Sequence, residues 1–149
     1  MIKIICVGKI KEKYLSMAID EYLKRLSKYS KIDIVEIPDE PVKEKALVIE
    51  GEKILNKIND KDYVITLDIL GKSVSSLEFS SFLENQFVHN SNIVFVIGGS
   101  YGLADFVKKR SNYSLSFSKM TFPHQLFRVM LLEQIYRSFK IANNESYHK

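Results

Sequence analysis

The chain has 149 residues, which suits one domain of ordinary size with a single core, and we expect residues 1–149 to form that domain. Hydrophobic residues make up 46% of the sequence and charged residues 27%, as is typical of soluble globular proteins. No apolar run approaches the length needed to span a bilayer, and the apolar stretch Ile2 to Val7 is too short for a signal peptide. We therefore expect a cytoplasmic protein without a membrane partner.

The formal net charge of +4 permits RNA binding without requiring it, because a nucleic-acid surface needs a clustered basic face. Three clusters could contact phosphate, although each is also typical of a solvated surface: Lys9 to Lys13, Lys24-Arg25 and Lys108-Lys109-Arg110. Cys6 is the only cysteine, so no internal disulfide is possible, and its apolar surroundings favour packing as a small hydrophobe. One cysteine and three widely separated histidines lack the usual zinc-site spacing, so we expect no metal.

Short apolar runs and helical periodicities alternate along the chain. The runs predict strands over Ile2 to Val7, Ile32 to Ile37, Tyr63 to Ile69, Asn92 to Ile97 and Tyr113 to Leu115. The periodicities predict helices over Tyr14 to Leu26, Ala46 to Ile58, Ser75 to about Phe87, Leu103 to Arg110 and from Pro123 onward. This alternation is typical of an α/β protein, a parallel sheet with helices on both faces.

Local signals set several boundaries. Pro38 ends the second strand, and Asp39 to Lys45 reads as a surface loop. Gly71-Lys72 should end the third strand. Ser75-Ser76-Leu77-Glu78 has the form of a capping box at a helix start, while Gly51 inside a helix costs about 1 kcal/mol relative to Ala.

The final helix is apolar around most of its circumference, from Leu126 to Ile141. Such a helix must be buried on nearly all sides, and a single sheet can cover only about half of it. A second copy of the chain would cover the rest, because most soluble oligomers are symmetric homo-oligomers, so the helix predicts a homodimer. The alternative is a central core helix in a monomer.

Two segments suggest a ligand site. The glycine-rich stretch Gly98 to Gly102 follows the most apolar strand, where ligands bind in open α/β sheets, although a plain turn would look the same. Its spacing matches neither the dinucleotide fingerprint nor the P-loop. The loop Phe117 to Phe122 offers backbone amides and carbonyls between apolar side chains, a surface that suits an adenine ring.

The carboxy-terminal residues carry the titratable groups. His124 lies in the first helical turn, and we favour capping or packing over a direct role in catalysis. Arg128 and Arg137 on an apolar helix each need an acidic partner such as Glu133, or an RNA phosphate, and Arg137 is the better RNA candidate. The tail Tyr147-His148-Lys149 combines a stacking ring, an imidazole and a cation, which suits RNA binding; otherwise it is an idle terminus.

A family resemblance joins these segments. Ile97 to Gly102, Leu115 to Leu126, Glu133 to Arg137 and Tyr147 to Lys149 resemble, in order and spacing, the SPOUT-class methyltransferases that modify N3 of a pseudouridine in 23S ribosomal RNA. The likeness covers essentially the whole chain. It implies a trefoil knot, which hydrophobic periodicity does not reveal. It also implies S-adenosylmethionine as cofactor and ribosomal RNA or the assembled ribosome as partner.

The resemblance further implies which residues form the site. The expected cofactor pocket consists of Leu67, Gly98, Phe117, Ser118, Lys119, Met120, Thr121 and Phe122. The tail would close over this pocket, with His148 as a hypothetical proton acceptor, Tyr147 stacked on a base, and Arg137, His124 and Lys149 contacting RNA. Two alternatives remain: a SPOUT enzyme for another RNA such as tRNA, and a non-catalytic dimeric RNA-binding module.

Overall fold

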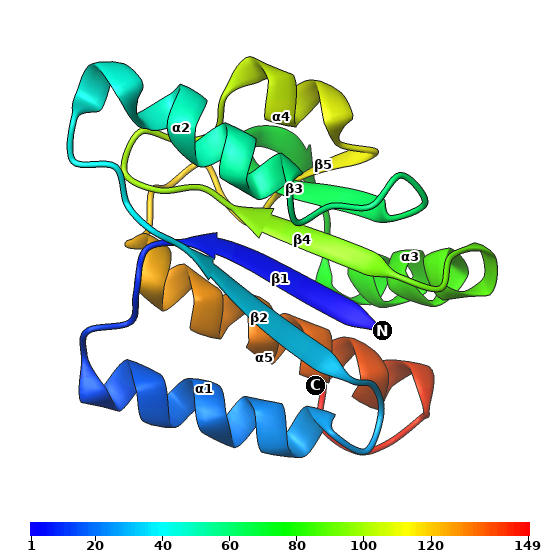
Figure 1. The fold of residues 1–149 in the computed structure, drawn as a ribbon. Helices are drawn as coiled ribbons and strands as arrows, with labels where there is room; N and C mark the ends of the chain where they lie inside the picture. The colour runs from blue at the N-terminus through cyan, green and yellow to red at the C-terminus, as the bar shows by residue number, and fades with distance from the viewer.

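The structure is a computed structural model that describes residues 1–149, and all its strands belong to one sheet. The strands are β1 (Ile2–Val7), β2 (Ile32–Ile37), β3 (Tyr63–Ser73), β4 (Ile93–Ile97) and β5 (Tyr113–Ser116). The helices are α1 (Lys13–Leu26), α2 (Lys43–Leu55), α3 (Ser76–His89), α4 (Asp105–Arg110) and α5 (His124–Ala142). The sheet has the order β2-β1-β4-β3-β5 with every pair parallel, which confirms the α/β prediction (Figure 1).

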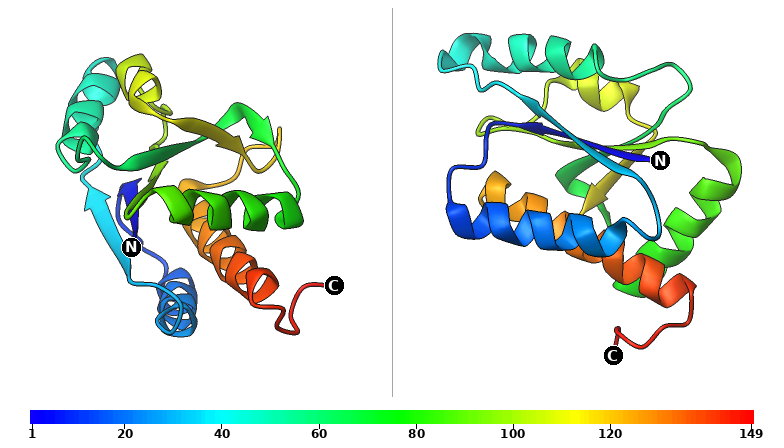
Figure 2. Two further views of the ribbon diagram at one scale, coloured as in Figure 1. Left: turned by 90° about the vertical axis from the view of Figure 1, so that its right-hand side faces the viewer. Right: turned by 60° about the horizontal axis from the view of Figure 1, so that its bottom comes forward.

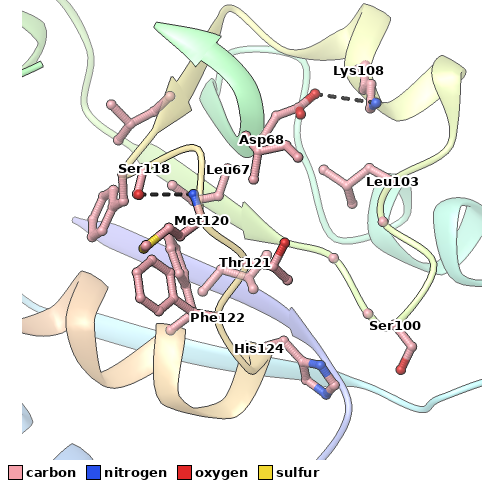
Figure 3. Close-up of a pocket in the computed structure, with 18 residues that line it drawn as sticks. Leu67, Asp68, Ser100, Leu103, Lys108, Ser118, Met120, Thr121, Phe122 and His124 are labelled. Carbon is pink, nitrogen blue, oxygen red and sulfur yellow. Dashed lines mark hydrogen bonds and ion pairs between the residues drawn. The ribbon is translucent and has the colours of Figure 1, made fainter. Parts of the chain in front are cut away.

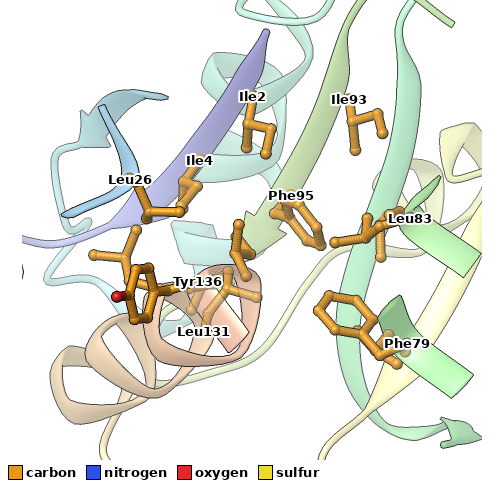
Figure 4. Packing of buried hydrophobic residues seen from close by; sticks show 14 of the residues in the cluster. Ile2, Ile4, Leu26, Phe79, Leu83, Ile93, Phe95, Leu131 and Tyr136 are labelled. Atoms are coloured by element: carbon orange, nitrogen blue, oxygen red, sulfur yellow. The ribbon is translucent and has the colours of Figure 1, made fainter. Parts of the chain in front are cut away.

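Helices cover both faces of this sheet, so the molecule has three layers. Helices α1, α3 and α5 pack on one face and α2 and α4 on the other (Figures 1 and 2). On the first face, Ile4 and Phe95 of the central strands meet Leu131 and Tyr136 of α5 (Figure 4). Strands with both faces covered must be apolar throughout, which explains why β4, Ile-Val-Phe-Val-Ile, is buried at every residue.

Helix α5 lies between α1 and α3, as Figure 2 shows, and it is only partly enclosed. Leu131, Leu132 and Ile135 on its inner side are completely buried against the sheet. On the outer side Met130 remains half-exposed, and Leu126 is 38% exposed. The sheet and its neighbouring helices therefore leave an apolar strip uncovered near the amino end of α5.

One helix start was predicted from its capping residues, that of α3. The Ser75 hydroxyl accepts a hydrogen bond from the Glu78 amide at 3.1 Å, and the Glu78 carboxylate accepts one from the Ser75 amide at 2.9 Å. The predicted capping box is thus confirmed. Hydrogen bonds with Ser75 also hold the pKa of the Glu78 carboxyl below its usual value.

The prediction that Gly71-Lys72 ends the third strand was wrong. Strand β3 continues to Ser73, and Lys72 pairs with Leu115 of β5 after a register shift. A side chain at position 71 would lie 2.7 Å from the Ser114 carbonyl carbon, so glycine lets the two backbones approach each other. Helix α2 also begins three residues before the predicted Ala46, and α5 begins at His124 with Pro123 as its N-cap residue.

Cys6 is buried in β1, as its apolar pattern suggested. Burial raises the pKa of its thiol to about 12, so the reactive thiolate is suppressed at neutral pH. The thiol therefore packs as a small apolar group. None of the helices combines the length and the apolar character needed to cross a membrane.

Candidate functional site

The main cavity of the molecule, here called the edge pocket, opens where the parallel strands end. Its volume is about 270 Å³, near the lower end of the range for small-molecule sites, which begins at about 300 Å³. Three loops form it: the ends of β3 and β4 and the segment between β5 and α5 (Figure 3). This is the position at which open α/β sheets bind ligands.

Apolar side chains make up half of the pocket lining. They come from β3, β4, the loop after β4, β5 and α5: Leu67, Ile69, Ile97, Leu103, Leu115, Phe117, Met120, Phe122 and Phe127. The rings of Phe117 and Phe127 pack with centroids 4.7 Å apart, which joins the loop to the first turns of α5. Apolar walls with few polar groups suit a flat heterocycle.

The glycine-rich loop after β4 closes upon itself beside the pocket. Gly99 and Gly102 form a β-bridge, and Gly102 has a φ of +81°, in the left-handed region that favours glycine. A Cβ on Gly98 would lie 2.7 Å from the Gly102 carbonyl oxygen. Glycine at position 98 is therefore required for the loop to fold, and the folded loop brings its backbone to the pocket wall.

The segment between β5 and α5 is shaped by serine hydroxyls. The Ser116 hydroxyl donates to the Ser118 carbonyl oxygen at 3.1 Å, and the Ser118 hydroxyl accepts from the Met120 amide at 3.0 Å. Such side-chain bonds stabilise a tight turn without regular secondary structure. Met120 is 72% exposed, so the turn presents an apolar side chain at the rim of the pocket.

One ion pair lies in the pocket wall and was not predicted from the sequence. The Lys108 ammonium on α4 is 3.3 Å from the Asp68 carboxylate in the middle of β3, where its pairing with β5 shifts register (Figure 3). Ser100 and Thr121 add further hydroxyls to the lining. The pocket thus offers charged and polar partners on one side and apolar surface on the other.

His124 lies in the first turn of α5 and lines the pocket (Figure 3). Its Nε2 atom is 3.4 Å from the position that a Cβ on Gly8 would occupy, so the ring packs close to the end of β1. This packing agrees with the interpretation we favoured from the sequence. The ring is half-buried and retains an edge toward the cavity.

The structure brings together seven of the eight residues expected to hold the cofactor. Leu67, Gly98, Phe117, Ser118, Met120, Thr121 and Phe122 all line the edge pocket. Lys119 does not line it, because the turn at Ser118 leaves Lys119 exposed on the outside of the loop. Sequence reasoning did not assign Asp68, Leu103, Lys108 and Phe127 to the pocket, because only the fold brings their segments together.

The tail residues form a second group at the other end of α5, here called the tail cluster: Glu133, Arg137, Tyr147 and His148. Arg137 binds Glu133 through Nη2 at 2.6 Å and Nε at 3.0 Å, and its Nη1 lies 3.0 Å from His148 Nδ1. The Tyr147 hydroxyl donates to Glu133 at 3.3 Å, and the Arg137 guanidinium lies 4.7 Å from the centre of the Tyr147 ring. The tail is therefore not an idle terminus, whereas Lys149 is exposed.

A second set of contacts holds the tail close to helix α1. The Tyr29 hydroxyl donates to Glu145 at 2.6 Å, and the Lys140 ammonium lies 3.1 Å from the same carboxylate. These hydrogen bonds lower the pKa of the Glu145 carboxyl. Asn144 adopts a left-handed φ of 55°, which turns the chain back toward α5 after the helix ends.

The tail cluster and the edge pocket of one chain are far apart. Along α5, Arg137 lies 13 residues from His124 and 10 residues from Phe127, or about 20 Å and about 15 Å at about 1.5 Å per residue, and Glu133 is the cluster residue nearest the pocket. Within one chain, the tail therefore does not close over the pocket.

The partner of Arg128 is a distant residue. Its Nη1 donates to Glu36 on β2 at 2.7 Å, its Nη2 donates to the Gly8 carbonyl at 3.1 Å, and its side chain is 2% exposed. The sequence offered Arg128 an acidic partner such as Glu133 or an RNA phosphate. The structure pairs it with an acid, which is Glu36 and not Glu133. No group of three His, Cys, Asp or Glu side chains in the structure could hold a metal ion.

A parallel α/β sheet with a pocket at the carboxyl side of its strands is typical of proteins that bind small ligands, and comparison with known proteins identifies the family. Residues 1–148 match the family described as "Predicted SPOUT methyltransferase", and the chain belongs to this family of methyltransferases.

Similar proteins named "Ribosomal RNA large subunit methyltransferase H" occur in Clostridium botulinum (strain Alaska E43 / Type E3), at 63% identity, and Clostridium acetobutylicum, at 57%. Each match covers 99% of both chains. A probable methylase family protein from Haemophilus influenzae Rd KW20 has a similar structure, with a TM-score of 0.59 and 14% identity. That match covers 99% of this chain and 70% of the other, and at this identity it shows the fold alone.

Proposed function

We propose that this protein uses S-adenosylmethionine to methylate N3 of a pseudouridine in 23S ribosomal RNA. The observation that carries the proposal is the edge pocket, in which the segments that resemble this family meet at the carboxyl end of the sheet. The names of the relatives at 57% to 63% identity support the same activity.

The pocket residues fit this cofactor. The apolar walls around Leu67, Phe117 and Phe122 accommodate an adenine ring, and the backbone of Gly98 and of the turn at Ser118 supplies polar partners for its edge. When bound, S-adenosylmethionine supplies an electrophilic methyl group. The role of this chain is to hold the methyl group and the target base in line, and such positioning can lower a barrier by about 7–11 kcal/mol.

The proposal includes a homodimer formed along α5. The uncovered strip with Leu126 and Met130 lies beside a second cavity of about 250 Å³, which Phe117, Phe122 and Gln134 help to line. A twofold axis that pairs two α5 helices in antiparallel fashion would cover this strip on each copy. It would also bring the tail cluster of one copy to the edge pocket of the other, across the distance of about 15–20 Å that separates them within a chain. His148 and Tyr147 would then act on a base bound at the other copy's pocket.

The trefoil knot belongs to the same proposal. Strand β3 pairs with β5 on both sides of a register shift between Leu67 and Lys72. The end of β5, from which the chain continues toward α5, is therefore still paired with β3. A chain that threads at this point and is pulled by its ends in a force experiment would extend less than an unknotted chain of the same length. Full extension to the unknotted length would remove the knot from the proposal.

The RNA would lie across the carboxyl edge of the sheet. The loop between β1 and α1 carries Lys9 and Lys11, and the Lys11 amide donates to the Gln125 side chain at the start of α5 at 3.1 Å. This contact places the loop beside His124 and the edge pocket. Exposed Lys119 on the neighbouring turn adds a further cation to this surface.

Methyl incorporation tests the function directly. Radiolabelled S-adenosylmethionine would be supplied with intact ribosomes, free 23S RNA or tRNA, and binding of the cofactor would be measured by calorimetry. We expect cofactor binding and incorporation into 23S RNA, with the assembled ribosome as the preferred substrate. Incorporation into tRNA alone would indicate a different substrate, and cofactor binding without any incorporation would leave only a binding module.

A further inference from the structure

The tail cluster shows which nitrogen of the His148 ring carries the proton. Arg137 Nη1 lies 3.0 Å from His148 Nδ1. A guanidinium has only donors and remains charged, so Nδ1 must contribute its lone pair to this contact. In a neutral imidazole the other nitrogen then carries the hydrogen. His148 therefore presents an Nε2–H donor on its exposed side.

Arg137 is firmly held in this position. Two of its nitrogens bind Glu133, the Tyr147 ring lies against its guanidinium, and hydrogen bonding to Glu133 raises its pKa further above the usual value. Burial, followed by the charge of Glu133, also raises the pKa of Tyr147, whose hydroxyl donates to that carboxylate. Neither Arg137 nor Tyr147 can therefore take a proton from a substrate near neutral pH.

The other charged and titratable groups around the tail cluster do not alter this assignment. They are Lys149, which follows His148 in the chain, and Tyr22 on α1, which influences the pKa values of Arg137 and Tyr147. None of them makes a hydrogen bond to His148 in the structure, so Arg137 is the neighbour that determines which ring nitrogen is free.

We infer that His148 donates a hydrogen bond from Nε2 to a carbonyl oxygen beside N3 of the target base, and that the Glu133–Arg137 pair is a positioning pair that fixes this tautomer. This inference rests on the proposed function and replaces the role of proton acceptor suggested by the sequence. The donor stabilises negative charge on the ring after N3 has lost its proton, as donors in an oxyanion hole do.

The electron balance of the step is as follows. The N3–H bond breaks and its proton passes to water, which leaves an electron pair on N3 and charge shared with the flanking carbonyl oxygens. That pair forms the new bond from N3 to the methyl carbon. The electron pair of the breaking carbon–sulfur bond stays on sulfur, which becomes a neutral thioether.

The tautomer can be measured without any assay of activity. Nitrogen NMR of the dimer labelled with ¹⁵N-histidine should show His148 with a protonated Nε2 and an unprotonated Nδ1, assigned by loss of the signals in His148→Gln. In Arg137→Met the two tautomers should mix. A wild-type ring that carries its hydrogen on Nδ1, or an equal mixture of the two forms, would overturn the inference even if the protein methylates ribosomes.

Kinetics on intact ribosomes separate a donor from a base. A glutamine amide can donate from nearly the place of Nε2, whereas asparagine is too short and alanine has no donor. We expect His148→Gln to retain kcat within roughly tenfold of wild type, and His148→Ala and His148→Asn to lose roughly 10²–10³-fold. His89→Gln, at the exposed end of α3, is the matched control and should leave kcat unchanged.

The pH profile gives the third result. If His148 is a hydrogen-bond donor, the wild-type rate should keep rising with pH as the imide ionises. His148→Ala, which lacks the donor, should recover activity at high pH. A base predicts a break in the profile, with the rate falling on the acid side, because a protonated imidazole has no lone pair with which to accept the proton. Such a break, together with a His148→Gln rate as low as that of His148→Ala, would refute the donor role. If wild type does not methylate any RNA, the proposed function fails, and the NMR result still decides the tautomer.

Discussion

At its amino end, α5 borders a cavity with largely apolar walls; at its carboxyl end it carries a network of ionised side chains. The edge pocket has an ion pair, Asp68–Lys108, in its wall, and the half-buried imidazole of His124 at its margin. The tail cluster joins Glu133, Arg137, Tyr147 and His148 through hydrogen bonds, and none of these residues lines the edge pocket. In the proposed function, the amino end would bind the cofactor and the carboxyl end would act on the base.

This difference teaches that a small chain can divide its chemistry between the two ends of one helix. In the proposed homodimer, an antiparallel pair of such helices would complete two equal sites, because each amino end would meet a carboxyl end. The chain then needs no additional domain to close the pocket. Variants that alter one end of α5 at a time separate the two roles, and deletion of the tail has the largest expected effect.

Deleting Tyr147-His148-Lys149 should give the largest difference between the loss of methyl transfer and the loss of cofactor affinity. We expect methyl transfer to fall by roughly 10³-fold or more, because a positioned donor alone contributes about 10²–10³. The affinity for S-adenosylmethionine should change less than about threefold, since the pocket residues remain. Single-turnover methylation and calorimetry measure the two quantities. Loss of cofactor affinity in step with activity would contradict the division between the two ends.

Gly98→Ala should weaken cofactor binding, in contrast to deletion of the tail. The new Cβ would lie 2.7 Å from the Gly102 carbonyl oxygen, so the loop must shift. We expect cofactor affinity to fall by roughly 10- to 100-fold, equivalent to about 1.4–2.8 kcal/mol. Gly102→Ala is the control: it meets open space but strains a left-handed φ, which costs about 1–2 kcal/mol of stability. Equal cofactor affinity in Gly98→Ala and wild type would show that this loop does not shape the site.

Arg128→Met should loosen the amino end of α5. The change leaves Glu36 and the Gly8 carbonyl without their donor, and losing a charged hydrogen bond at a largely buried site costs roughly 1.5–3 kcal/mol. Urea unfolding measures the loss. Glu36→Gln retains an acceptor and should cost less. An unchanged free energy of unfolding in Arg128→Met would mean that this pair does not hold the helix in place.

Replacing Lys9, Lys11 and Lys13 by alanine tests whether RNA binds beside the amino end of α5. We expect RNA affinity to fall without a change in cofactor affinity, and the slope of log affinity against log salt to decrease by about 2–3, roughly one per lost phosphate contact. Alanine at Lys24, Lys28 and Lys31, near the far end of α1, provides a control of equal charge change. An equal loss in both triple variants would point to net charge and not to a defined surface.

Glu50→Gln is the mildest change near the pocket. Glu50 is 4% exposed, its Oε2 accepts from the Glu40 amide, and its Oε1 has no partner. Burial raises the pKa of its carboxyl, so the stability it contributes is fully present below the ordinary value of 4.5 and is lost as pH rises through the folded-state pKa. The variant should therefore be more stable than wild type at pH 7, with the difference shrinking toward pH 4.5. A stability difference between variant and wild type that grows on acidification would contradict the raised pKa of Glu50.

Local signals in the sequence predicted much of this fold. The capping box at Ser75 and the apolar run in β4 depend on neighbours within a few residues, and both were located correctly. Gly71 was misleading because it looked like a strand break, whereas Gly51 was correctly placed inside a helix without a reason for its presence. Each makes room for a segment far along the chain, Gly71 for Ser114 and Gly51 for Phe106.

The candidate site was predictable only in part. The motif residues that line the pocket follow from the resemblance, but the Asp68–Lys108 pair and the Glu36 partner of Arg128 join residues 40 and 92 positions apart. Lys119 was assigned to the cofactor because it lies within the motif, and the hydroxyl-bonded turn at Ser118 places it outside the pocket. Side-chain direction in an irregular loop depends on such bonds, which spacing does not encode.

Mixed dimers give the most direct test that each site is shared between two copies. Gly98→Ala, defective at the pocket, and the chain lacking Tyr147-His148-Lys149, defective at the tail, would be unfolded together, refolded and assayed on ribosomes. Random pairing puts about half of the dimers in mixed form, each with one intact site, so activity should recover to about a quarter of wild type. The assay uses a cofactor concentration too low for Gly98→Ala alone to turn over, and a mixture no more active than its two separate components would contradict the shared site.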